Sequence, residues 1–503
     1  MVDLTPKLLS FIPADAQQVA QIGECAQLAD RYRAINPTAN YQVIAPGAAL
    51  PENLDCLDCL VIPNLAAVEN LAQYLGQLQP PGLVIGACPN HDYWQSQAHP
   101  PALNQEQVLQ NLTAHLELLD LQADLDQATP AFSQFCQHLE QPDANRLLTH
   151  TFYFRASKTA LTQPRLLIHT FISAPIGCDR VRVLEPDYFS ATHPLNRTVQ
   201  VRVGESISLN IAHPSEQRVL IWQRALLRYP EDLAKQKLLL KNGYLIVAEH
   251  DDDPYFWPEN ADHKFLLFWS SHCVQTSTPA LAEHMRQWNP NVTVFANQLA
   301  YLPPPRQYPK TNRITLFFGA LNRQADWEPI MPSLNQILRK FQQVSVQVVH
   351  DRAFFDALET KHKQFTPWCA YEQYQKILHS CDIGILPLND TQFNRMKSDL
   401  KFLEHAGHGT VALASPVVYA NSIIEGETGM IYHNLDQFSA KLTELIRNHT
   451  LRQAIATNAY QWVKQNRLMS QHYQARRQWY LEMRAQLPRL NAELRDRCPQ
   501  LFS

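Results

Sequence analysis

The segment DIGILPLNDTQFNRMKSDLKFLEHAGHGTVALAS, residues 382–415, decides the fold of this chain. It begins and ends with short apolar runs that have the length and composition of buried parallel strands. Between these runs, residues 396–407 place Phe402, Leu403 and Ala406 on one helical face. Two buried strands joined by a helix predict a parallel α/β sheet with right-handed crossovers.

The rest of the chain repeats this alternation of strands and helices in three blocks. Residues 1–160 form the first block, 161–305 the second and 306–485 the third, and 486–503 are predicted as a C-terminal tail. The proline-rich segment YLPPPRQYPK, 301–310, is the predicted linker between the last two blocks, because proline disfavours helix and keeps the chain extended. The sequence therefore predicts an α/β protein with three Rossmann-like parallel-sheet domains, whose ligands bind beyond the carboxyl ends of the strands.

Length, charge and composition exclude several function classes. The 503 residues are enough for several domains, and the net charge of −4 is spread evenly, so no basic field indicates nucleic acid. No run approaches the roughly 18 to 20 apolar residues of a membrane span, and the N-terminus lacks a secretory signal pattern, so we expect a cytoplasmic protein. The ten cysteines show no second CxxC and no zinc-finger histidine pair, so we predict reduced thiols and no metal site.

The predicted helix at 396–407 carries its charges on one arc. Lys397, Lys401 and Glu404 lie together on the side away from the apolar face. Two lysines one turn apart repel each other, and an anion between them would relieve that repulsion. Because the helix follows a strand of the sheet, its free N–H groups and its dipole favour a phosphate. A solvated surface on which Glu404 pairs with Lys401 is the alternative.

The stretch from DIGILPL through KSDLKFLEHAGHGTVALASPVVYANSIIEGETGMIY, which ends at residue 432, resembles the C-terminal domain of the GT-B glycosyltransferases related to retaining glycosyltransferase family 4. In that family a glutamate at the Glu404 position bonds the ribose hydroxyls of the donor nucleotide. A second glutamate usually stands seven residues earlier, near the transferred sugar, and Lys397 stands there in this chain. The resemblance implies that Lys397 and Glu404 are catalytic and that the second and third blocks form a GT-B pair.

The strand FFGAL matches the first strand and glycine turn of the same domain, with Gly319 where the backbone passes close to the diphosphate. Alanines stand where many relatives carry an arginine and a lysine, and Arg323 is the nearest substitute. The loop at 415–418 would line the donor site through backbone groups. The predicted donor-binding residues are Gly319, Arg323, Lys397, Lys401, Glu404, Ser415, Val417 and Val418.

The second block supplies the candidate acceptor residues. IHTFISAPIGCDRVRVLEPDYF, residues 168–189, resembles the glycine-containing first turn of GT-B N-terminal domains, and GYLIVAEHDDDPYFW places 250–253 just beyond an apolar strand. Three adjacent carboxylates repel one another unless a cation or a hydroxyl-rich ligand is near. A structural or capping cluster, an acceptor contact and a divalent-metal site are the alternatives. The predicted acceptor-binding residues are Gly177, Arg180, His250, Asp251 and Asp252.

The first block resembles a class I methyltransferase. VAQIGECAQLADRYRAINPTANYQVIAP, residues 19–46, stands where such enzymes carry their first strand, glycine-rich loop and second strand. A methyl-donor site needs several glycines, but only Gly23 is present, and the expected acidic residue is replaced around Ala45 and Pro46. We therefore expect a degenerate domain that packs against the rest or docks a protein partner, with a working methyltransferase as the alternative.

The resemblance implies a glycosyltransferase of the hexosyltransferase type that moves a sugar from a UDP or GDP donor to a glycan or protein acceptor with retention. The departing diphosphate gains about two negative charges, so positioned cations and N–H groups are its natural catalysts. The nucleotide sugar is a co-substrate, and no bound cofactor is expected. The alternative is a non-catalytic scaffold or partner subunit built from degenerate Rossmann domains.

Overall fold

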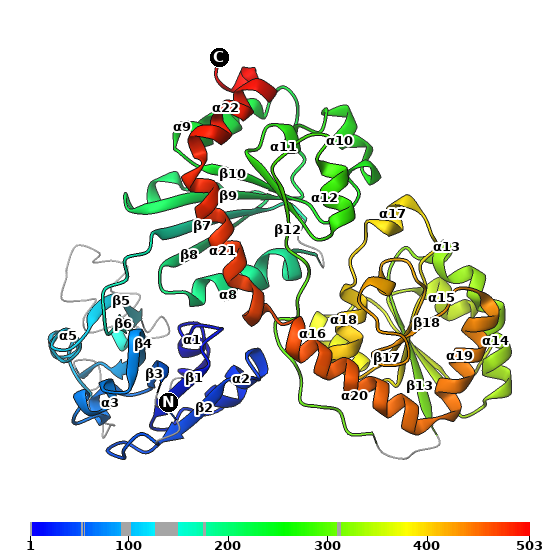
Figure 1. The fold of residues 1–503 in the computed structure, drawn as a ribbon, viewed down its shortest axis with the longest axis horizontal. Helices are drawn as coiled ribbons and strands as arrows, with labels where there is room; N and C mark the ends of the chain where they lie inside the picture. The colour runs from blue at the N-terminus through cyan, green and yellow to red at the C-terminus, as the bar shows by residue number, and fades with distance from the viewer. Residues whose placement is uncertain are drawn as a thin grey trace, which may run out of the picture. The chain divides into compact units, whose positions relative to one another are not determined.

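The computed structural model describes residues 3–51, 54, 56–91, 102–125, 149–174, 178–308 and 313–503. The chain divides into two compact units. The first comprises Met1–Leu167, Pro186–Thr198 and His213–Gln217, and the second comprises Ile168–Glu185, Val199–Ala212 and Arg218–Ser503. Three six-stranded sheets with interleaved helices form the fold (Figure 1). The predicted α/β class with three Rossmann-like sheets is confirmed.

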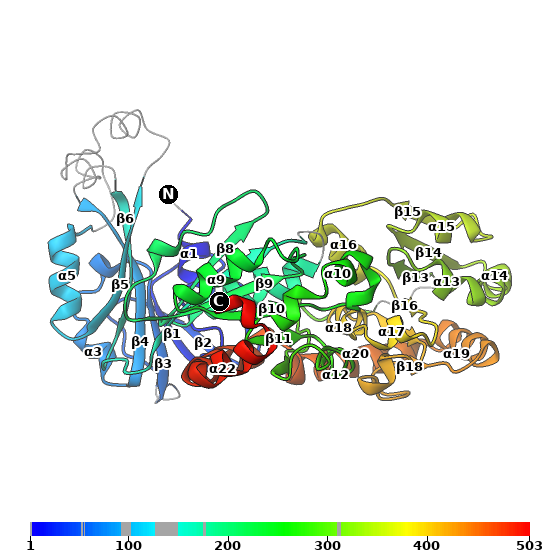
Figure 2. The same ribbon diagram turned by 90° about the horizontal axis from the view of Figure 1, so that it is seen from above.

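The first sheet has the strand order β2-β1-β3-β4-β6-β5. Its strands are β1 (Gln18–Ile22), β2 (Asn40–Ile44), β3 (Leu57–Ile62), β4 (Leu78–Pro89), β5 (Glu117–Leu125) and β6 (Thr149–Ser157). Its helices are α1 (Thr5–Leu9), α2 (Leu28–Ile35), α3 (Ala72–Leu75) and α5 (Gln105–Thr113). Strand β6 runs antiparallel to β4 and to β5, and Figure 2 shows these strands side by side. Because successive strand residues face opposite sides, Val19 and Ala20 enter different cores.

The second sheet has the strand order β12-β11-β10-β9-β7-β8. Its strands are β7 (Arg165–Ile172), β8 (Asn196–Arg202), β9 (Glu216–Gln223), β10 (Leu245–Glu249), β11 (Cys273–Thr276) and β12 (Val292–Val294). Its helices are α8 (Glu185–Thr192), α9 (Leu233–Lys241), α10 (Pro258–Asp262), α11 (Leu266–Trp269) and α12 (Pro279–Met285). Helix α12 begins after Thr278, whose hydroxyl accepts a hydrogen bond from the Leu281 N–H at 3.3 Å, and Pro279 is its first residue.

The third sheet is parallel throughout, with the order β15-β14-β13-β16-β17-β18. Its strands are β13 (Ile314–Gly319), β14 (Val344–Val349), β15 (Lys363–Thr366), β16 (Ile383–Leu386), β17 (Val411–Ala414) and β18 (Met430–Ile431). The helices between and after them are α13 (Gln324–Trp327), α14 (Met331–Lys340), α15 (Arg352–Ala357), α16 (Tyr371–His379), α17 (Gln392–Arg395), α18 (Leu400–Gly407), α19 (Leu435–Arg447) and α20 (His449–Asn466). Buried apolar strands covered by amphipathic helices make up its core.

The deciding segment folds as strand, helix and strand, but its helix begins four residues later than predicted, at Leu400. The predicted helix at 396–407 is α18 alone, and a separate short α17 precedes it. The Asp399 carboxylate does not cap α18, because it accepts hydrogen bonds from Arg467 at 2.7 and 3.0 Å and from Ser422 at 2.5 Å. Lys397 therefore lies in the connection between α17 and α18, and the expectation that it shares one helix with Lys401 is corrected.

The second and third sheets are joined by two chain crossings. The predicted linker is the first, and it has no helix or strand over 301–308. The second leads from α20 to α21 (Met469–Ala485) and α22 (Leu487–Arg497). The crossings are hydrogen bonded to each other, because Leu299 N donates to Arg467 O at 2.9 Å and Met469 N donates to Leu299 O at 2.8 Å. The predicted tail is helical and contributes Leu494, Cys498 and Leu501 to the core of the second sheet.

The cysteines of the described ranges are free thiols, most of them buried. Burial raises the pKa of Cys88 to about 11 and that of Cys178 to about 12, so these thiols are protonated at neutral pH. Among the residues that the structure describes, no helix combines the length and apolarity that crossing a bilayer requires.

Candidate functional site

A cavity of about 630 Å³ lies at the carboxyl ends of strands from the second and third sheets. Its walls follow β7, β9 and β10 on one side and β13, β14 and β16 on the other. This edge of a parallel sheet is where ligands bind. Gly177 lies outside the described residues. The predicted site residues that line the cavity are Arg180, Asp251, Asp252, Gly319, Arg323, Lys397, Lys401 and Glu404.

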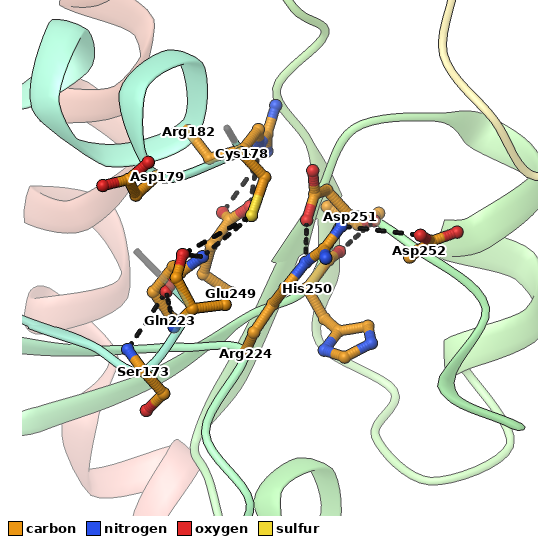
Figure 3. A network of polar contacts seen from close by, with 12 residues as sticks. Ser173, Cys178, Asp179, Arg182, Gln223, Arg224, Glu249, His250, Asp251 and Asp252 are labelled. Atoms are coloured by element: carbon orange, nitrogen blue, oxygen red, sulfur yellow. Dashed lines mark hydrogen bonds and ion pairs between the residues drawn. The ribbon is translucent and has the colours of Figure 1, made fainter. Parts of the chain in front are cut away.

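Arg224, on the second-sheet wall of the cavity, contacts both predicted acceptor carboxylates, Asp251 and Asp252, as Figure 3 shows. Arg224 Nε donates to Asp251 Oδ1 at 2.6 Å, and Arg224 Nη2 lies 3.6 Å from Asp252 Oδ2. The Arg224 guanidinium also lies over the Trp257 ring, 5.2 Å from its centroid. Burial alone would raise the pKa of Asp251, but Arg224 and Arg182 hold it below its ordinary value. Asp251 is therefore ionised at neutral pH.

His250 does not line the cavity. Its ring packs against Trp257 and Phe268, with centroids 5.6 and 5.4 Å away, and only 3% of the residue is exposed. Neither ring nitrogen has a hydrogen-bond partner among the described residues. Burial lowers the pKa of His250 to about 3, so the imidazole is neutral. The predicted acceptor role of His250 is corrected, because its side chain turns into the core while Asp251 and Asp252 face the cavity.

Behind these carboxylates lies a fully buried ion pair that the sequence did not indicate (Figure 3). Arg182 Nε donates to Glu249 Oε1 at 2.7 Å, and neither side chain is exposed. Arg182 Nη1 also donates to Phe295 O at 2.6 Å and to Asn297 Oδ1 at 2.8 Å. Asn297, which lines the cavity, in turn donates to Ser398 Oγ at 2.8 Å. The pair thus fixes the orientation of an amide at the cavity wall.

Glu404 is a buried carboxylate at the bottom of the third-sheet wall. It accepts hydrogen bonds from Tyr371 Oη at 2.7 Å, Tyr374 Oη at 3.1 Å and Lys401 Nζ at 3.0 Å. Burial alone would raise the pKa of Glu404, but Lys401 and the Tyr371 hydroxyl lower it, so the carboxylate is ionised. The pairing with Lys401 that the sequence left as an alternative exists, but Glu404 is 1% exposed and does not lie on a solvated surface.

The remaining predicted cations of the cavity are already paired. Lys397 Nζ donates to both oxygens of Asp252, at 2.6 and 2.7 Å. Arg323 Nη1 donates to Asp326 Oδ2 at 3.1 Å and to Asn394 Oδ1 at 2.8 Å. Lys401 Nζ bonds Glu404 and also donates to Tyr374 Oη at 2.9 Å, with a side chain that is 36% exposed.

Arg180 and Gly319 stand at opposite walls of the cavity. Arg180 donates to Glu185 at 2.9 Å and to Glu372 at 2.6 Å, and it lies 4.6 Å from the centroid of Tyr371. A Cβ atom at Gly319 would come within 2.8 Å of the Tyr374 ring. Glycine at this turn therefore lets the ring and the backbone approach closely.

The loop at 415–418 does not line the cavity, which corrects the prediction for Ser415, Val417 and Val418. The Ser415 hydroxyl accepts a hydrogen bond from Leu388 N at 3.0 Å, and both valines pack against an apolar cluster beneath β17. Tyr419 lines the cavity at this point instead. Val418 has a φ of 57°, which is costly for a β-branched residue and marks the turn that presents Tyr419.

Stacked aromatic rings along the third-sheet wall were also missed by sequence reasoning. Trp368 stacks on His350 at 5.1 Å and 20°, and His350 lies nearly parallel to Tyr374 at 6.2 Å and 19°. Tyr374 is parallel to Tyr371 at 5.9 Å and 9°. All four residues line the cavity, and Trp368 is 62% exposed. His350 has a φ of 75°, so no helix or strand periodicity could have placed its ring there.

Comparison with known proteins finds one family model that matches part of the chain. Residues 333–481 match the sequence model of a family described as glycosyl transferase-like. This span contains α18, with Lys401 and Glu404, and most of the third-sheet wall of the cavity. No curated protein matches the sequence.

Three solved structures to which the chain is similar can be named. They are TarM of S. aureus (10% identity, TM-score 0.41, 53% of this chain and 55% of TarM), HepE of Anabaena in complex with UDP and glucose (11% identity, TM-score 0.45, 63% of this chain and 100% of HepE), and a glycosyltransferase from Rickettsia africae (14% identity, TM-score 0.44, 63% of this chain and 98% of that chain). The chain spans about half the length of TarM, 55% of it.

The buried neutral His250 predicts a pH-dependent stability. The unfolded chain takes up a proton at the ordinary pKa of 6.5, whereas folded His250 does so only near 3, so acid favours unfolding. In His250→Phe, the fall in the free energy of unfolding between about pH 6 and pH 4 should be shallower by about 1.4 kcal/mol per pH unit. Chemical denaturation followed by tryptophan fluorescence measures this. The exposed His433, changed to Gln, is the control, and equal slopes in wild type and His250→Phe would contradict the assignment.

Proposed function

We propose that the second unit is a glycosyltransferase that moves a sugar, with retention, from a nucleoside-diphosphate donor to a hydroxyl of a glycan or protein acceptor. The observation that carries this proposal is one cavity at the carboxyl ends of two sheets, lined by Lys397, Lys401 and Glu404 on one wall and by Asp251 and Asp252 on the other. The match of residues 333–481 to a glycosyl transferase-like family supports it. The cavity's volume of about 630 Å³ is within the range of small-molecule sites.

The donor diphosphate would lie between the Gly319 turn and Lys401. The departing diphosphate gains negative charge as the glycosidic bond breaks, so a fixed ammonium beside it lowers the barrier. Lys401 is the most suitable cation described on this wall, because its side chain is 36% exposed while Glu404 holds it in place. Arg323 faces Asp326 and Asn394, and it would act mainly by shaping the turn that follows Gly319.

Glu404 would accept a hydrogen bond from a ribose hydroxyl. An ionised carboxylate offers about four acceptor positions, and three of them are filled by Tyr371, Tyr374 and Lys401. The remaining position suits a hydroxyl donor. The tyrosines and the lysine hold the carboxylate in one orientation, which reduces the entropy that binding must remove. Glu404 would therefore position the nucleotide, and Lys397 and Lys401 would supply the charge.

The nucleobase would stack on Trp368. A flat heteroaromatic base gains about 1–3 kcal/mol from stacking on an aromatic side chain. Trp368 is held parallel to His350, and its exposed indole lines the same cavity as Lys401. A nucleotide whose diphosphate lies at Lys401 would thus bring its base to the aromatic wall.

The acceptor would bind at Asp251, Asp252 and Arg180. Carboxylates that face a cavity accept hydrogen bonds from the hydroxyls of a glycan or of a serine or threonine side chain. Each of the two aspartates already has a protein cation, Arg224 or Lys397, so their charges are compensated without a divalent ion. No group of three or more potential ligand side chains suited to a metal occurs in the described part of the chain.

For the first unit we propose a packing or partner-docking role in place of methyl transfer. Within the first sheet, Tyr41 Oη donates to Gln21 Oε1 at 2.7 Å and Gln21 Nε2 donates to Gly23 O at 2.7 Å. These bonds fill the end of β1, where a methyl-donor site would require open backbone. Isothermal calorimetry of the full chain with S-adenosylmethionine should therefore show no heat of binding. Saturable binding would restore the methyltransferase alternative.

Lys401→Met should weaken the binding of UDP or GDP by about ten- to a hundredfold, because a charge-assisted hydrogen bond contributes roughly 1.5–3 kcal/mol. A panel of nucleotides and nucleotide sugars, followed by thermal shift and nucleotide release, identifies the ligand first. Lys361→Met, at an exposed lysine of the third-sheet domain, is the matched control and should leave affinity unchanged. If no nucleotide stabilises the wild type, the chain is the non-catalytic scaffold.

The variant Trp368→Ala distinguishes the contribution of the base to nucleotide binding from the contribution of the phosphates. The variant should bind UDP or GDP about tenfold more weakly, because it loses the stacking surface, while its affinity for inorganic pyrophosphate stays the same. Both affinities are measured by calorimetry on the same preparation. An equal loss for pyrophosphate and nucleotide would show that Trp368 supports the wall and does not contact the base.

A further inference from the structure

The ion pair between Lys397 and Asp252 spans the cavity. Lys397 lies between α17 and α18 on the third-sheet wall, and Asp252 follows β10 on the second-sheet wall. The ammonium donates to both carboxylate oxygens, at 2.6 and 2.7 Å, and the two side chains are 20% and 11% exposed. Lys397, which the proposed function assigns to the donor diphosphate, is thus already paired with the Asp252 carboxylate.

The backbone that carries Lys397 is fixed to the second-sheet wall. Phe393 stacks on Phe256 with centroids 4.9 Å apart, and Met396 belongs to the core cluster of the second sheet. Ser398 accepts a hydrogen bond from Asn297 at 2.8 Å. Because the residues on both sides of Lys397 are held, an exchange of its partner requires motion of the lysine side chain and not of the chain around it.

Asp252 has a second cation in reach. Arg224 Nη2 lies 3.6 Å from Asp252 Oδ2, and Arg224 is itself anchored through Nε to Asp251. Lys397 has no second anion in comparable reach among the described residues, since its other close neighbour is the face of the Phe393 ring, 4.1 Å from its ammonium. Burial lowers the pKa of Lys397 although Asp252 acts in the opposite direction, so the ammonium needs an anion beside it. If Lys397 turns to another anion, Asp252 stays compensated by Arg224.

We propose that Asp252 occupies Lys397 in place of the donor diphosphate, so that donor binding exchanges one anion for another and Asp252 sets the donor affinity by competition. This inference rests on the proposed function. It predicts that removing a negatively charged side chain from the cavity wall strengthens anion binding at the opposite wall, through Lys397 alone. A purely structural ion pair would give weaker binding or none when it is broken.

Asp252→Asn in the full chain tests the proposal, with UDP and GDP as the probes and calorimetry as the measurement. The amide keeps the size of the side chain but removes its charge, so the dissociation constant of the nucleotide that binds should fall about tenfold. Asp262→Asn removes one negative charge at an exposed position of the same domain and is the control, with a change of less than about twofold expected. Asp252→Ser gives the same test if the asparagine variant fails to fold.

A double-mutant cycle assigns the gain to Lys397. Lys397→Met alone should bind the nucleotide more weakly than the wild type, and adding Asp252→Asn to it should bring no gain. A gain that persists without Lys397, or unchanged or weaker binding by Asp252→Asn, would overturn the competition while leaving the proposed function in place. If the wild type and every variant bind neither nucleotide, the proposed function fails and this inference fails with it.

Discussion

The buried ion pair between Arg182 and Glu249 is the interaction on which the cavity depends. It joins the turn after β7 to the end of β10, and through Phe295 and Asn297 it fixes the segment after β12. Gln275 of β11 donates to the second oxygen of Glu249 at 2.6 Å, so Arg182 and the end of β11 are both tied to the carboxylate at the end of β10. A buried charge of this kind is stable only when every hydrogen-bonding position is filled, and the residues that fill them cannot shift independently.

The charged side chains of the cavity are arranged in ion pairs, and the pairs differ in whether both members lie on the same wall. Arg224 and Asp251 belong to one wall and are held by their own strand ends. Lys401 and Glu404 belong to the other wall, three residues apart on α18. Lys397 and Asp252 connect the two walls, and Arg180 of the second-sheet wall also pairs with Glu372 of α16. In the exchange proposed above, the Lys397–Asp252 pair is the one that opens, while the pairs within each wall stay in place.

The sequence predicted what depends on local pattern. Apolar runs at 383–388 and 411–414 contain β16 and β17, and the predicted residues Asp251, Asp252, Gly319 and Lys401 do line one cavity. The helix at 396–407 was predicted too long, because the Asp399 carboxylate is engaged by Arg467, a partner 68 residues away that no spacing reveals.

The aromatic wall and the loop after β17 depend on backbone angles that the sequence does not specify. The left-handed conformations of His350 and Val418 direct Trp368's partner ring and Tyr419 into the cavity, and both residue types ordinarily avoid that region. His250 was misplaced for a related reason. Alternation along a strand predicts which face a residue takes, but His250 lies just beyond β10, where the chain turns and only tertiary packing decides the direction.

The pairing of the two crossings at Leu299 and Leu468 has a mechanical consequence. The second crossing has only residues 467 and 468 between α20 and α21, so the two crossings are held together at one point. Any widening of the space between the second and third sheets would therefore turn about this point. Because α22 packs into the core of the second sheet and α20 packs on the third, the chain is anchored in a folded domain on both sides of the crossings. Opening and closing would then return the two walls to the same register on every cycle.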